Sequence, residues 1–259
     1  ESAEELRSAV SELESAGKRY MLIGNGSNLL FADGELDMTV ISTAGLNNIR
    51  VSGNTVSAGA GASLSSAAAA ARNASLTGLE FAHGIPGTVG GAVFMNAGAY
   101  GGEMKDVINS VTVLLKGEIS EIPAEKCGFS YRKSAFEDNG AIILSARMEL
   151  LPGSLEEITA KMRELMERRR EKQPLEYPSA GSTFKRPEGY FSGKLIEDAG
   201  LRGFSVGDAA VSEKHCGFVI NKGKATSADI YKLICEVKKR VYESADVSLE
   251  PEVIMIGKF

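Results

Sequence analysis

A glycine-rich block over residues 84–102 carries the strongest chemical signal in this chain. Seven of its nineteen residues are glycine: Gly84, Gly87, Gly90, Gly91, Gly98, Gly101 and Gly102. Glycine permits a positive φ and a close approach of a ligand to the backbone, and successive bare N–H groups bind anions such as phosphate. The block has neither the lysine of a Walker loop nor the spacing of a Rossmann fingerprint. It predicts either a phosphate-binding loop or a glycine-rich turn in a tightly packed sheet.

A second candidate phosphate loop, Gly-Asn-Gly-Ser-Asn over residues 24–28, directly follows a short apolar strand at Tyr20–Ile23. Its backbone amides and its hydroxyl are donors that suit a phosphate group. A plain turn is the alternative interpretation, and it is favoured if the chain has no other phosphate loop.

Three further motifs carry side chains suited to electrostatic and acid–base chemistry, although each is too common to assign a role by itself. Arg132 lies in Phe-Ser-Tyr-Arg-Lys-Ser, Ser182 in Pro-Ser-Ala-Gly-Ser-Thr-Phe-Lys, and Glu252 in Leu-Glu-Pro-Glu-Val. A basic run at residues 168–172 ends a predicted helix. That run is either a solvated helix end, where positive charge is favourable, or a landing site for a polyanionic ligand.

Composition excludes several classes of protein. A net charge of −5 argues against general nucleic-acid binding. Three scattered cysteines (Cys127, Cys216, Cys235) and two lone histidines (His83, His215) predict no disulfide framework and no metal site. We expect buried, reduced thiols in a cytoplasmic protein. The sequence has no apolar run long enough for membrane insertion and no signal peptide.

Periodicity and capping signals predict the elements that must position these motifs. The predicted helices cover residues 2–16, 64–73, 154–172 and 226–242, and the predicted strands cover residues 20–23, 49–51, 56–58, 107–115, 142–150 and 253–256. Early antiparallel hairpins and a separate unit after residue 152 indicate a mixed α and β protein. Because the chain lacks an initiator Met and opens inside a predicted helix, we expect residues to precede Glu1 in the full protein.

Taken together and in order, these motifs resemble the UDP-N-acetylenolpyruvoylglucosamine reductase family, the flavoenzymes of bacterial peptidoglycan synthesis. The resemblance spans nearly the whole chain and includes Gly-Lys-Leu-Ile-Glu-Asp-Ala-Gly-Leu at 193–201 and His-Cys-Gly-Phe-Val-Ile-Asn at 215–221. The motifs around Ser182 and Glu252 narrow the match to this reductase. The short interval between Arg132 and Ser182, with one predicted strand and one predicted helix, resembles the shorter form that lacks a tyrosine-bearing loop.

The resemblance implies an α+β fold. We expect an FAD-binding fold of the vanillyl-alcohol-oxidase/PCMH type, with two α+β subdomains, followed by a C-terminal α+β substrate-binding domain. The implied boundaries are an N-terminally incomplete first flavin subdomain at 1–43, a second at 44–150, the substrate domain at 151–248, and a last strand at 249–259 that returns to the flavin domain.

The resemblance also implies the reaction and its residues. Family members reduce UDP-N-acetylglucosamine enolpyruvate to UDP-N-acetylmuramate, with FAD as cofactor and NADPH as co-substrate. Hydride passes through FAD, and enolate-like charge then needs a stabilising cation and a proton. Arg132 matches the fixed guanidinium, Ser182 the proton donor and Glu252 the second acid–base partner.

Ligand contacts follow from the same resemblance. The residues expected to line the cofactor are Gly24, Asn25, Gly26, Ser27, Asn28, Leu29, Gly84, Ile85, Pro86, Gly87, Thr88, Gly90, Gly91, Ala92 and Asn96. The residues expected to contact the UDP-sugar substrate are Arg170, Lys172, Lys185, Arg186, Tyr190 and Asn221. His83 is either a cofactor contact or a packed loop residue.

Three positions depart from the family pattern: Asn25 where Gly is common, Asp208 where a second Gly is usual, and Ile254 where Arg is frequent. None is one of the three catalytic matches. Two alternatives stay open at the level of sequence. One is another FAD-dependent oxidoreductase of the same superfamily, and the other is a non-catalytic protein that binds a nucleotide sugar.

Overall fold

The computed structural model describes residues 2–259. The chain folds into two compact units. The first comprises Glu1–Asn25 and Asp37–Glu167, and the second comprises Gly26–Leu36 and Arg168–Phe259. The division therefore falls inside the first candidate phosphate loop and inside the long helix α5 (Leu155–Lys172).

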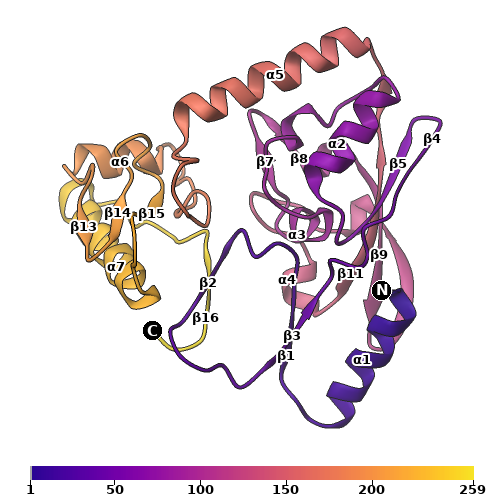
Figure 1. Ribbon diagram of the computed structural model, residues 1–259, viewed down its shortest axis with the longest axis horizontal. Helices are drawn as coiled ribbons and strands as arrows, with labels where there is room; N and C mark the ends of the chain where they lie inside the picture. Colours follow the sequence, from indigo (N-terminus) through magenta and orange to yellow (C-terminus); the bar gives the residue numbers. More distant parts are fainter. Residues whose placement is uncertain (1) are drawn as a thin grey trace. The chain divides into compact units, whose positions relative to one another are not determined.

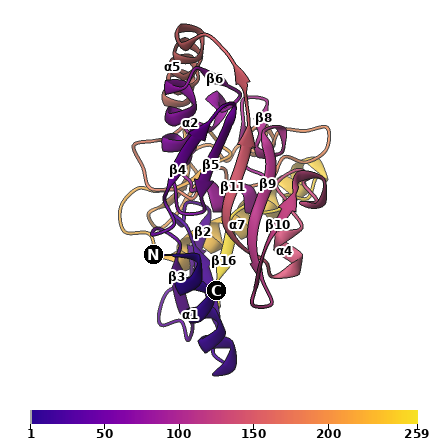
Figure 2. The same cartoon turned by 90° about the vertical axis from the view of Figure 1, so that its right-hand side faces the viewer.

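The first unit is built on a five-stranded antiparallel sheet with the order β10-β9-β11-β5-β4, and the strands lie side by side in Figure 2. They are β4 (Ile49–Ser52), β5 (Thr55–Gly59), β9 (Ile108–Leu115), β10 (Glu118–Pro123) and β11 (Ile142–Glu149). The hairpin predicted between residues 49 and 58 is the β4–β5 pair, and its turn contains Gly53 at φ +57°. A positive φ is the reason that glycine suits this turn.

Both faces of this sheet are covered. On one face lie α2 (Leu64–Asn73) and α3 (Val89–Phe94) (Figure 1), and α2 buries Leu64 and three alanines. Against the other face lies α1 (Ala3–Ser15), which packs its buried residues onto apolar side chains of β9 and β11. Burial on both sides accounts for the consecutive apolar residues Val113–Leu115 in β9 and Ile142–Leu144 in β11.

The start of α1 is the capping box predicted from the sequence. The Ser2 hydroxyl accepts a hydrogen bond from the backbone amide of Glu5, and the Glu5 carboxylate accepts one from the backbone amide of Ser2. After α1, β1 (Tyr20–Ile23) pairs in parallel with β3 (Thr39–Ser42).

Shorter elements complete the first unit. They are β6 (Leu76–Thr77), η1 (Glu80–Ala82), β7 (Gly98–Ala99), β8 (Gly102–Glu103), η2 (Met104–Asp106), η3 (Ala124–Lys126), α4 (Phe136–Asn139) and β12 (Leu151–Pro152). The interval between Arg132 and Ser182 therefore holds α4 and β12 besides the predicted strand and helix. Both are too short to give a periodic signal.

The second unit packs helices against a small antiparallel sheet of β13 (Ser205–Val206), β14 (Ala209–Val211) and β15 (Val219–Asn221). α6 (Ser192–Asp198) and α7 (Ser227–Ala245) contribute apolar residues to its core. A separate parallel pair joins β2 (Leu29–Phe31) to β16 (Ile254–Ile256).

The bounds of the two units differ from the sequence-based boundaries, which stay predictions about functional domains. The break at Glu167 lies within α5, because a helix can continue from one compact unit into the next. β16 pairs with β2, whose residues lie in the range 1–43 predicted as the first flavin subdomain, yet both strands group with the second unit.

The long helices carry many charges. α5 has 18 residues and α7 has 19, and only one stripe of each is buried. Throughout residues 2–259, no helix combines the length and the apolarity that crossing a membrane requires.

The N-terminus of α7 receives a cap from a distant carboxylate. Asp33 accepts hydrogen bonds from the amides of Ser227 (3.1 Å) and Ala228 (3.0 Å), and Thr226 accepts that of Asp229 (3.1 Å). Three of the amides that lack a partner within a helix are thereby satisfied. The hydrogen bonds from Ala228 and Ser227 lower the pKa of the Asp33 carboxyl.

Asp33→Ala should lower the thermal midpoint of the protein, because two helix amides lose their acceptor. A carboxyl whose pKa is depressed on folding stabilises above its unfolded pKa of about 3.9, and this contribution is lost as the pH falls through the folded pKa. The difference from the parent protein should therefore shrink below about pH 4. Thermal melts across this acid range and up to neutral pH measure it, with the exposed Asp37→Ala as control. An equal effect of both variants would contradict the capping role.

Candidate active site

The structure brings together the first part of one candidate cofactor loop and the middle of the other. The Asn25 amide group donates to the Pro86 carbonyl at 3.5 Å, and a Cβ built on Gly24 would strike the Thr88 side chain. Residues more than sixty positions apart in the sequence therefore lie against each other at the end of β1. The pairing supports one shared site, although each loop alone also permits a plain turn.

The glycines of the 84–102 block divide into two kinds. A Cβ on Gly90 would lie 2.8 Å from the Ala60 Cβ, and one on Gly102 would lie 2.7 Å from the Phe81 ring. These glycines are needed for packing within the chain. Gly91 is exposed, and a Cβ there would meet only the Thr88 hydroxyl, at 3.5 Å. Packing therefore accounts for Gly90 and Gly102, whereas no close contact within the chain requires a glycine at position 91.

Several amides of this block are already used within the chain. Those of Val89 and Gly90 donate to the carbonyls of Ala62 and Ala60, each at 2.8 Å, and that of Gly91 donates to the Thr88 hydroxyl at 3.3 Å. Donors for a cofactor pyrophosphate must therefore come from other amides of the two loops.

Asn96 has a different role from the one predicted. It is fully buried, with a φ of +45°, and its side chain donates to the Glu103 carboxylate (2.7 Å) and the Ser130 carbonyl (2.8 Å) while accepting from the Lys105 amide (2.9 Å). No surface is left for a ligand, so we reassign Asn96 to holding the segment that leads into Arg132. Thr88, Gly90 and Ala92 are likewise buried and shape the loop.

Arg132 lies in a tight turn with an unusual backbone. The amide of Ser130 and the carbonyl of Lys133 pair at 3.0 Å, and Arg132 has a φ of +54°. A long side chain in the left-handed region costs free energy, and such outliers cluster at functional sites. The guanidinium donates to the Gly98 carbonyl at 2.9 Å and lies over the Tyr131 ring. These contacts fix a cation beside the glycine block within the first unit.

The segments that carry Ser182 and Glu252 lie side by side in the second unit, joined by an antiparallel pairing. The Lys185 amide donates to the Glu250 carbonyl, and the Glu252 amide donates to the Thr183 carbonyl, both at 2.8 Å. Ser182 is half-buried, and its hydroxyl makes a long contact of 3.4 Å with the Phe184 carbonyl. Its proton is therefore only weakly engaged.

The second part of the first candidate cofactor loop joins this group. The Asn28 amide group donates to the Glu252 carbonyl at 3.0 Å, and the Ile254 amide donates to the Asn28 carbonyl at 3.0 Å. Residues near 28, 182 and 252 therefore meet in one place, which sequence order alone does not reveal.

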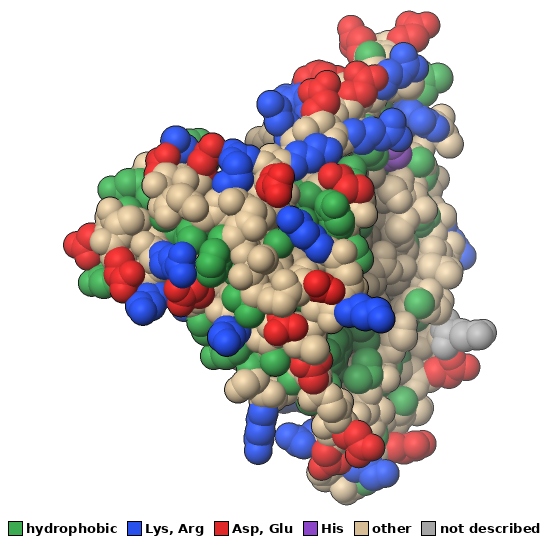
Figure 3. Space-filling model, turned by 60° about the vertical axis from the view of Figure 1, so that its left-hand side comes forward, with side chains coloured by type: hydrophobic (Ala, Val, Ile, Leu, Met, Phe, Trp, Pro, Cys, Tyr) green, Lys and Arg blue, Asp and Glu red, His purple; other side chains and the backbone are tan. Residues whose placement is uncertain are grey.

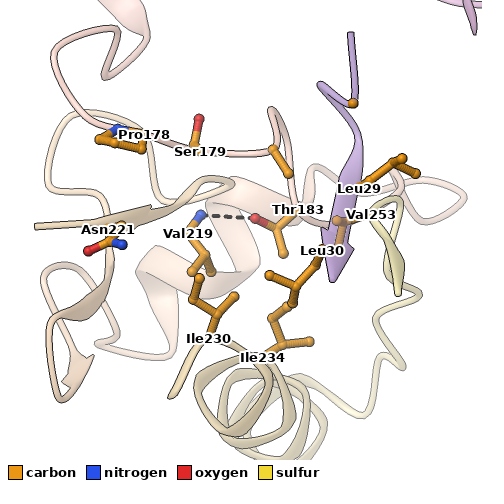
Figure 4. A pocket seen from close by; sticks show the side chains of 12 residues that line it. Leu29, Leu30, Pro178, Ser179, Thr183, Val219, Asn221, Ile230, Ile234 and Val253 are labelled. Carbon is orange, nitrogen blue, oxygen red and sulfur yellow. Dashed lines mark hydrogen bonds between the residues drawn. The ribbon is translucent and has the colours of Figure 1, made fainter. Parts of the chain in front are cut away.

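A cavity of about 220 Å³ adjoins these residues in the second unit (Figure 4). Its walls carry no charged side chain, and the Thr183 hydroxyl on one wall accepts a hydrogen bond from the Val219 amide at 2.9 Å. The residues that line it are Gly26, Leu29, Leu30, Pro178, Ser179, Ala180, Thr183, Val219, Asn221, Ile230, Ile234 and Val253. Such a lining suits an uncharged portion of a ligand, not a phosphate.

Asn221 and Lys185, both predicted substrate contacts, already have partners within the chain. The Asn221 side-chain oxygen accepts from the amides of Gly223 (2.9 Å) and Ala225 (3.1 Å), so it orders the loop before α7. Lys185 forms an ion pair of 2.6 Å with Glu250. Asn221 therefore forms the loop and also lines the cavity, and its contact with the substrate stays a prediction. Lys185 can bind an anion only in competition with Glu250.

The other predicted substrate contacts are more open. The Arg186 guanidinium lies 3.8 Å from the centroid of the exposed Phe191 ring and donates to the Tyr190 carbonyl at 3.1 Å. Tyr190, Arg170 and Lys172 are exposed or half-exposed. Basic and acidic side chains are interspersed over the face of the molecule drawn in Figure 3.

His215 is a functional candidate to which the sequence assigns no role beyond its place in the motif at 215–221. Its Nδ1 accepts a hydrogen bond from the Gly217 amide at 3.1 Å, and its ring meets Phe218 edge to face. Burial lowers the pKa of His215. A histidine two residues before a glycine is the only sequence signal, and it is too frequent to have identified the contact.

The cysteines follow the expectation in part. Cys127 and Cys216 are buried, and burial raises the pKa of Cys127 to about 11. Cys235 is exposed, contrary to the expectation, because α7 turns Leu233, Ile234 and Val237 inward and this position outward.

The residues of the first unit fit a cofactor. Gly91 leaves open space that a larger side chain would fill, and the Nδ1 atom of His83, next to Gly84, is buried with no hydrogen-bond partner in the part of the chain that the structure describes. A buried polar atom without a partner is costly unless a ligand supplies one.

Comparison with known proteins gives two family matches along the chain. Residues 1–122 match the family described as FAD binding domain, and residues 173–256 match the C-terminal domain of UDP-N-acetylenolpyruvoylglucosamine reductase. The fold class is thereby confirmed as α+β with an FAD-binding domain and a C-terminal domain of this reductase.

Relatives match over most of their length. The chain is 56% identical to UDP-N-acetylenolpyruvoylglucosamine reductase of Agathobacter rectalis, over 92% of this chain and 80% of the relative. It is 51% identical to that of Clostridium novyi, over 99% of this chain and 84% of the relative. The crystal structure of the Thermus caldophilus enzyme superposes with a TM-score of 0.85 at 36% identity, covering 99% of this chain and 90% of that one. The chain belongs to the UDP-N-acetylenolpyruvoylglucosamine reductase family.

Proposed function

We propose that this chain reduces UDP-N-acetylglucosamine enolpyruvate to UDP-N-acetylmuramate with NADPH, in the cytoplasm, as a step of peptidoglycan precursor synthesis. The observation that supports the proposal is the pairing of residues 183–185 with residues 250–252, which joins the segments that carry Ser182 and Glu252 in the part of the chain that matches the reductase's C-terminal domain. Another oxidoreductase of the superfamily is not favoured, because that C-terminal match is specific to this reductase.

FAD, when bound, supplies the hydride chemistry between NADPH and the enolpyruvyl group. The candidate residues for holding it in the first unit are Gly24, Asn25, residues 84–87 and Gly91. Among these, Gly91 offers an exposed backbone without a side chain. Gly26 to Leu29 extend the same loop into the second unit.

Three side chains have proposed roles in the reduction. Arg132 stabilises negative charge that develops on the substrate, because a guanidinium remains charged and grips a carboxylate in bidentate fashion. Ser182 donates the proton, which requires a strongly basic acceptor because a serine hydroxyl is a weak acid. Glu252 assists as the second electrostatic and acid–base partner.

Gly91→Val should reduce the flavin content of the purified protein while leaving it folded. The added side chain enters open space at the surface, where we place the cofactor. Gly90→Ala is the contrasting variant: its Cβ would press on Ala60 at 2.8 Å, so it should lower the thermal midpoint. Flavin absorbance per protein and thermal melts measure the two effects. Full flavin content in Gly91→Val would refute the placement.

Ser182→Ala should leave flavin reduction by NADPH nearly unchanged and slow reoxidation by the enolpyruvyl substrate. Loss of a general acid typically costs about 10²–10⁴-fold. Ser182→Cys should retain more activity, since a thiol also donates a proton. Stopped-flow absorbance follows the two half-reactions separately.

Ser192→Ala is the matched control, because the Ser192 hydroxyl contacts the same Phe184 carbonyl at the same 3.4 Å. It should leave both half-reactions close to normal. Slow flavin reduction with normal reoxidation in Ser182→Ala would exclude Ser182 as the proton donor.

Lys185→Ala should weaken substrate binding and make that binding less sensitive to ionic strength, if Lys185 contacts the diphosphate in competition with Glu250. Lys194→Ala is the control, because Lys194 forms a comparable surface pair with Asp198 at 2.5 Å. The substrate KM measured from low to high salt gives the comparison. Identical salt dependence in both variants would remove Lys185 from the site.

A further inference from the structure

We infer that His215 is a positioning residue for Ser182, acting through the backbone of Gly217. The inference rests on the proposed role of Ser182 as proton donor. Nothing in it requires His215 to touch the substrate or the cofactor.

A chain of two hydrogen bonds joins His215 to the Ser182 segment. The Gly217 amide donates to His215 Nδ1 at 3.1 Å, and the Gly217 carbonyl accepts the Thr183 amide hydrogen bond at 2.8 Å. Thr183 directly follows Ser182 in the chain. The orientation of Gly217 therefore affects where the Ser182 hydroxyl lies.

Packing at this point leaves little freedom. A Cβ built on Gly217 would lie 3.0 Å from His215 Cε1 and 3.6 Å from the Ser182 hydroxyl oxygen. A Cβ on Gly193 would lie 3.2 Å from the same imidazole carbon. The ring is thus wedged between two glycine backbones, and Phe218 meets it at a centroid distance of 5.1 Å. A displaced ring would release Gly217 and, with it, Ser182.

Two further hydrogen bonds hold the carbonyl and the hydroxyl of Thr183, independently of the bond from its amide to Gly217. The Glu252 amide donates to the Thr183 carbonyl at 2.8 Å, and the Val219 amide donates to the Thr183 hydroxyl at 2.9 Å. Removing the Gly217 restraint alone would leave these bonds intact. We therefore expect Ser182 to lose its alignment while the surrounding fold persists.

The contact needs a neutral imidazole with its proton on Nε2, because Nδ1 accepts from the Gly217 amide. Burial lowers the pKa of His215, which keeps the ring neutral at neutral pH. A protonated Nδ1 would face the Gly217 amide as a second donor.

The decisive experiment is a double-mutant cycle on the flavin-loaded enzyme. His215→Ala should slow reoxidation by the enolpyruvyl substrate on the order of 10-fold to 100-fold, as expected when a reacting group is misaligned. Flavin reduction by NADPH should stay normal. Combined with Ser182→Ala, the histidine change should add little further loss, because its effect passes through a hydroxyl that is already absent.

Two conservative variants separate positioning from bulk packing. His215→Asn keeps an acceptor near the place of Nδ1 and should recover most of the rate. His215→Gln puts its polar group nearer to the place of Nε2 and should recover little. Glu213→Gln, at an exposed neighbouring position, is the control and should behave as the parent. Thermal melts identify any variant that fails to fold.

The outcomes distinguish this inference from the proposed function. If Ser182→Ala slows reoxidation and His215→Ala does not, the positioning role of His215 is overturned and the role of Ser182 as proton donor is kept. The same conclusion follows if the double variant loses the full product of the two single losses in rate. Equal rates in the Asn and Gln variants would also overturn it. If Ser182→Ala itself leaves reoxidation normal, the proposed role of Ser182 fails first.

Discussion

The antiparallel pairing between residues 183–185 and residues 250–252 is the interaction on which the candidate chemistry of the second unit depends. Two backbone hydrogen bonds, each of 2.8 Å, join segments that lie about 65 positions apart in the sequence. Phe184, which is 2% exposed, anchors the pairing in the apolar core of this unit. Because the chain runs in register through this pairing, the backbone segments that carry Ser182 and Glu252 are held side by side. A weak acid such as serine gains from such constraint, since proton transfer needs the hydroxyl to be held within hydrogen-bond reach of its acceptor.

In the first unit the main constraint is different, because segments of the glycine block pack closely against neighbouring parts of the chain. Gly90 and Gly102 are small so that neighbouring segments of the same chain can touch, whereas at the exposed Gly91 a Cβ would meet only the Thr88 hydroxyl. A single glycine-rich block thus contains residues required for folding and at least one that folding does not require. The contacts around each glycine therefore distinguish the packing positions more clearly than the number of glycines does.

Charged side chains differ in how firmly the structure holds them. The Lys185–Glu250 and Lys194–Asp198 pairs lie at the surface, where such pairs contribute little to stability. Arg132 differs, because a strained turn and a hydrogen bond to the Gly98 carbonyl hold its guanidinium in one place. A cation that is fixed in advance stabilises developing negative charge without the cost of reorganising.

Sequence by itself determined the longest helices and strands and the chemical class. The capping box of α1, the β4–β5 hairpin and the apolar face of α7 follow from signals between residues that are close in the sequence. The order of the motifs along the chain was sufficient to indicate the family. Tertiary structure alone decided how the side chains are used. Asn96 and Asn221 carry the same amide as any binding asparagine, but burial in one case and loop hydrogen bonds in the other occupy their polar atoms. His215 gained a role only when the fold placed its Nδ1 against Gly217. Residue type and spacing specify which hydrogen bonds a side chain is able to make, whereas contacts between distant segments decide which of them are made.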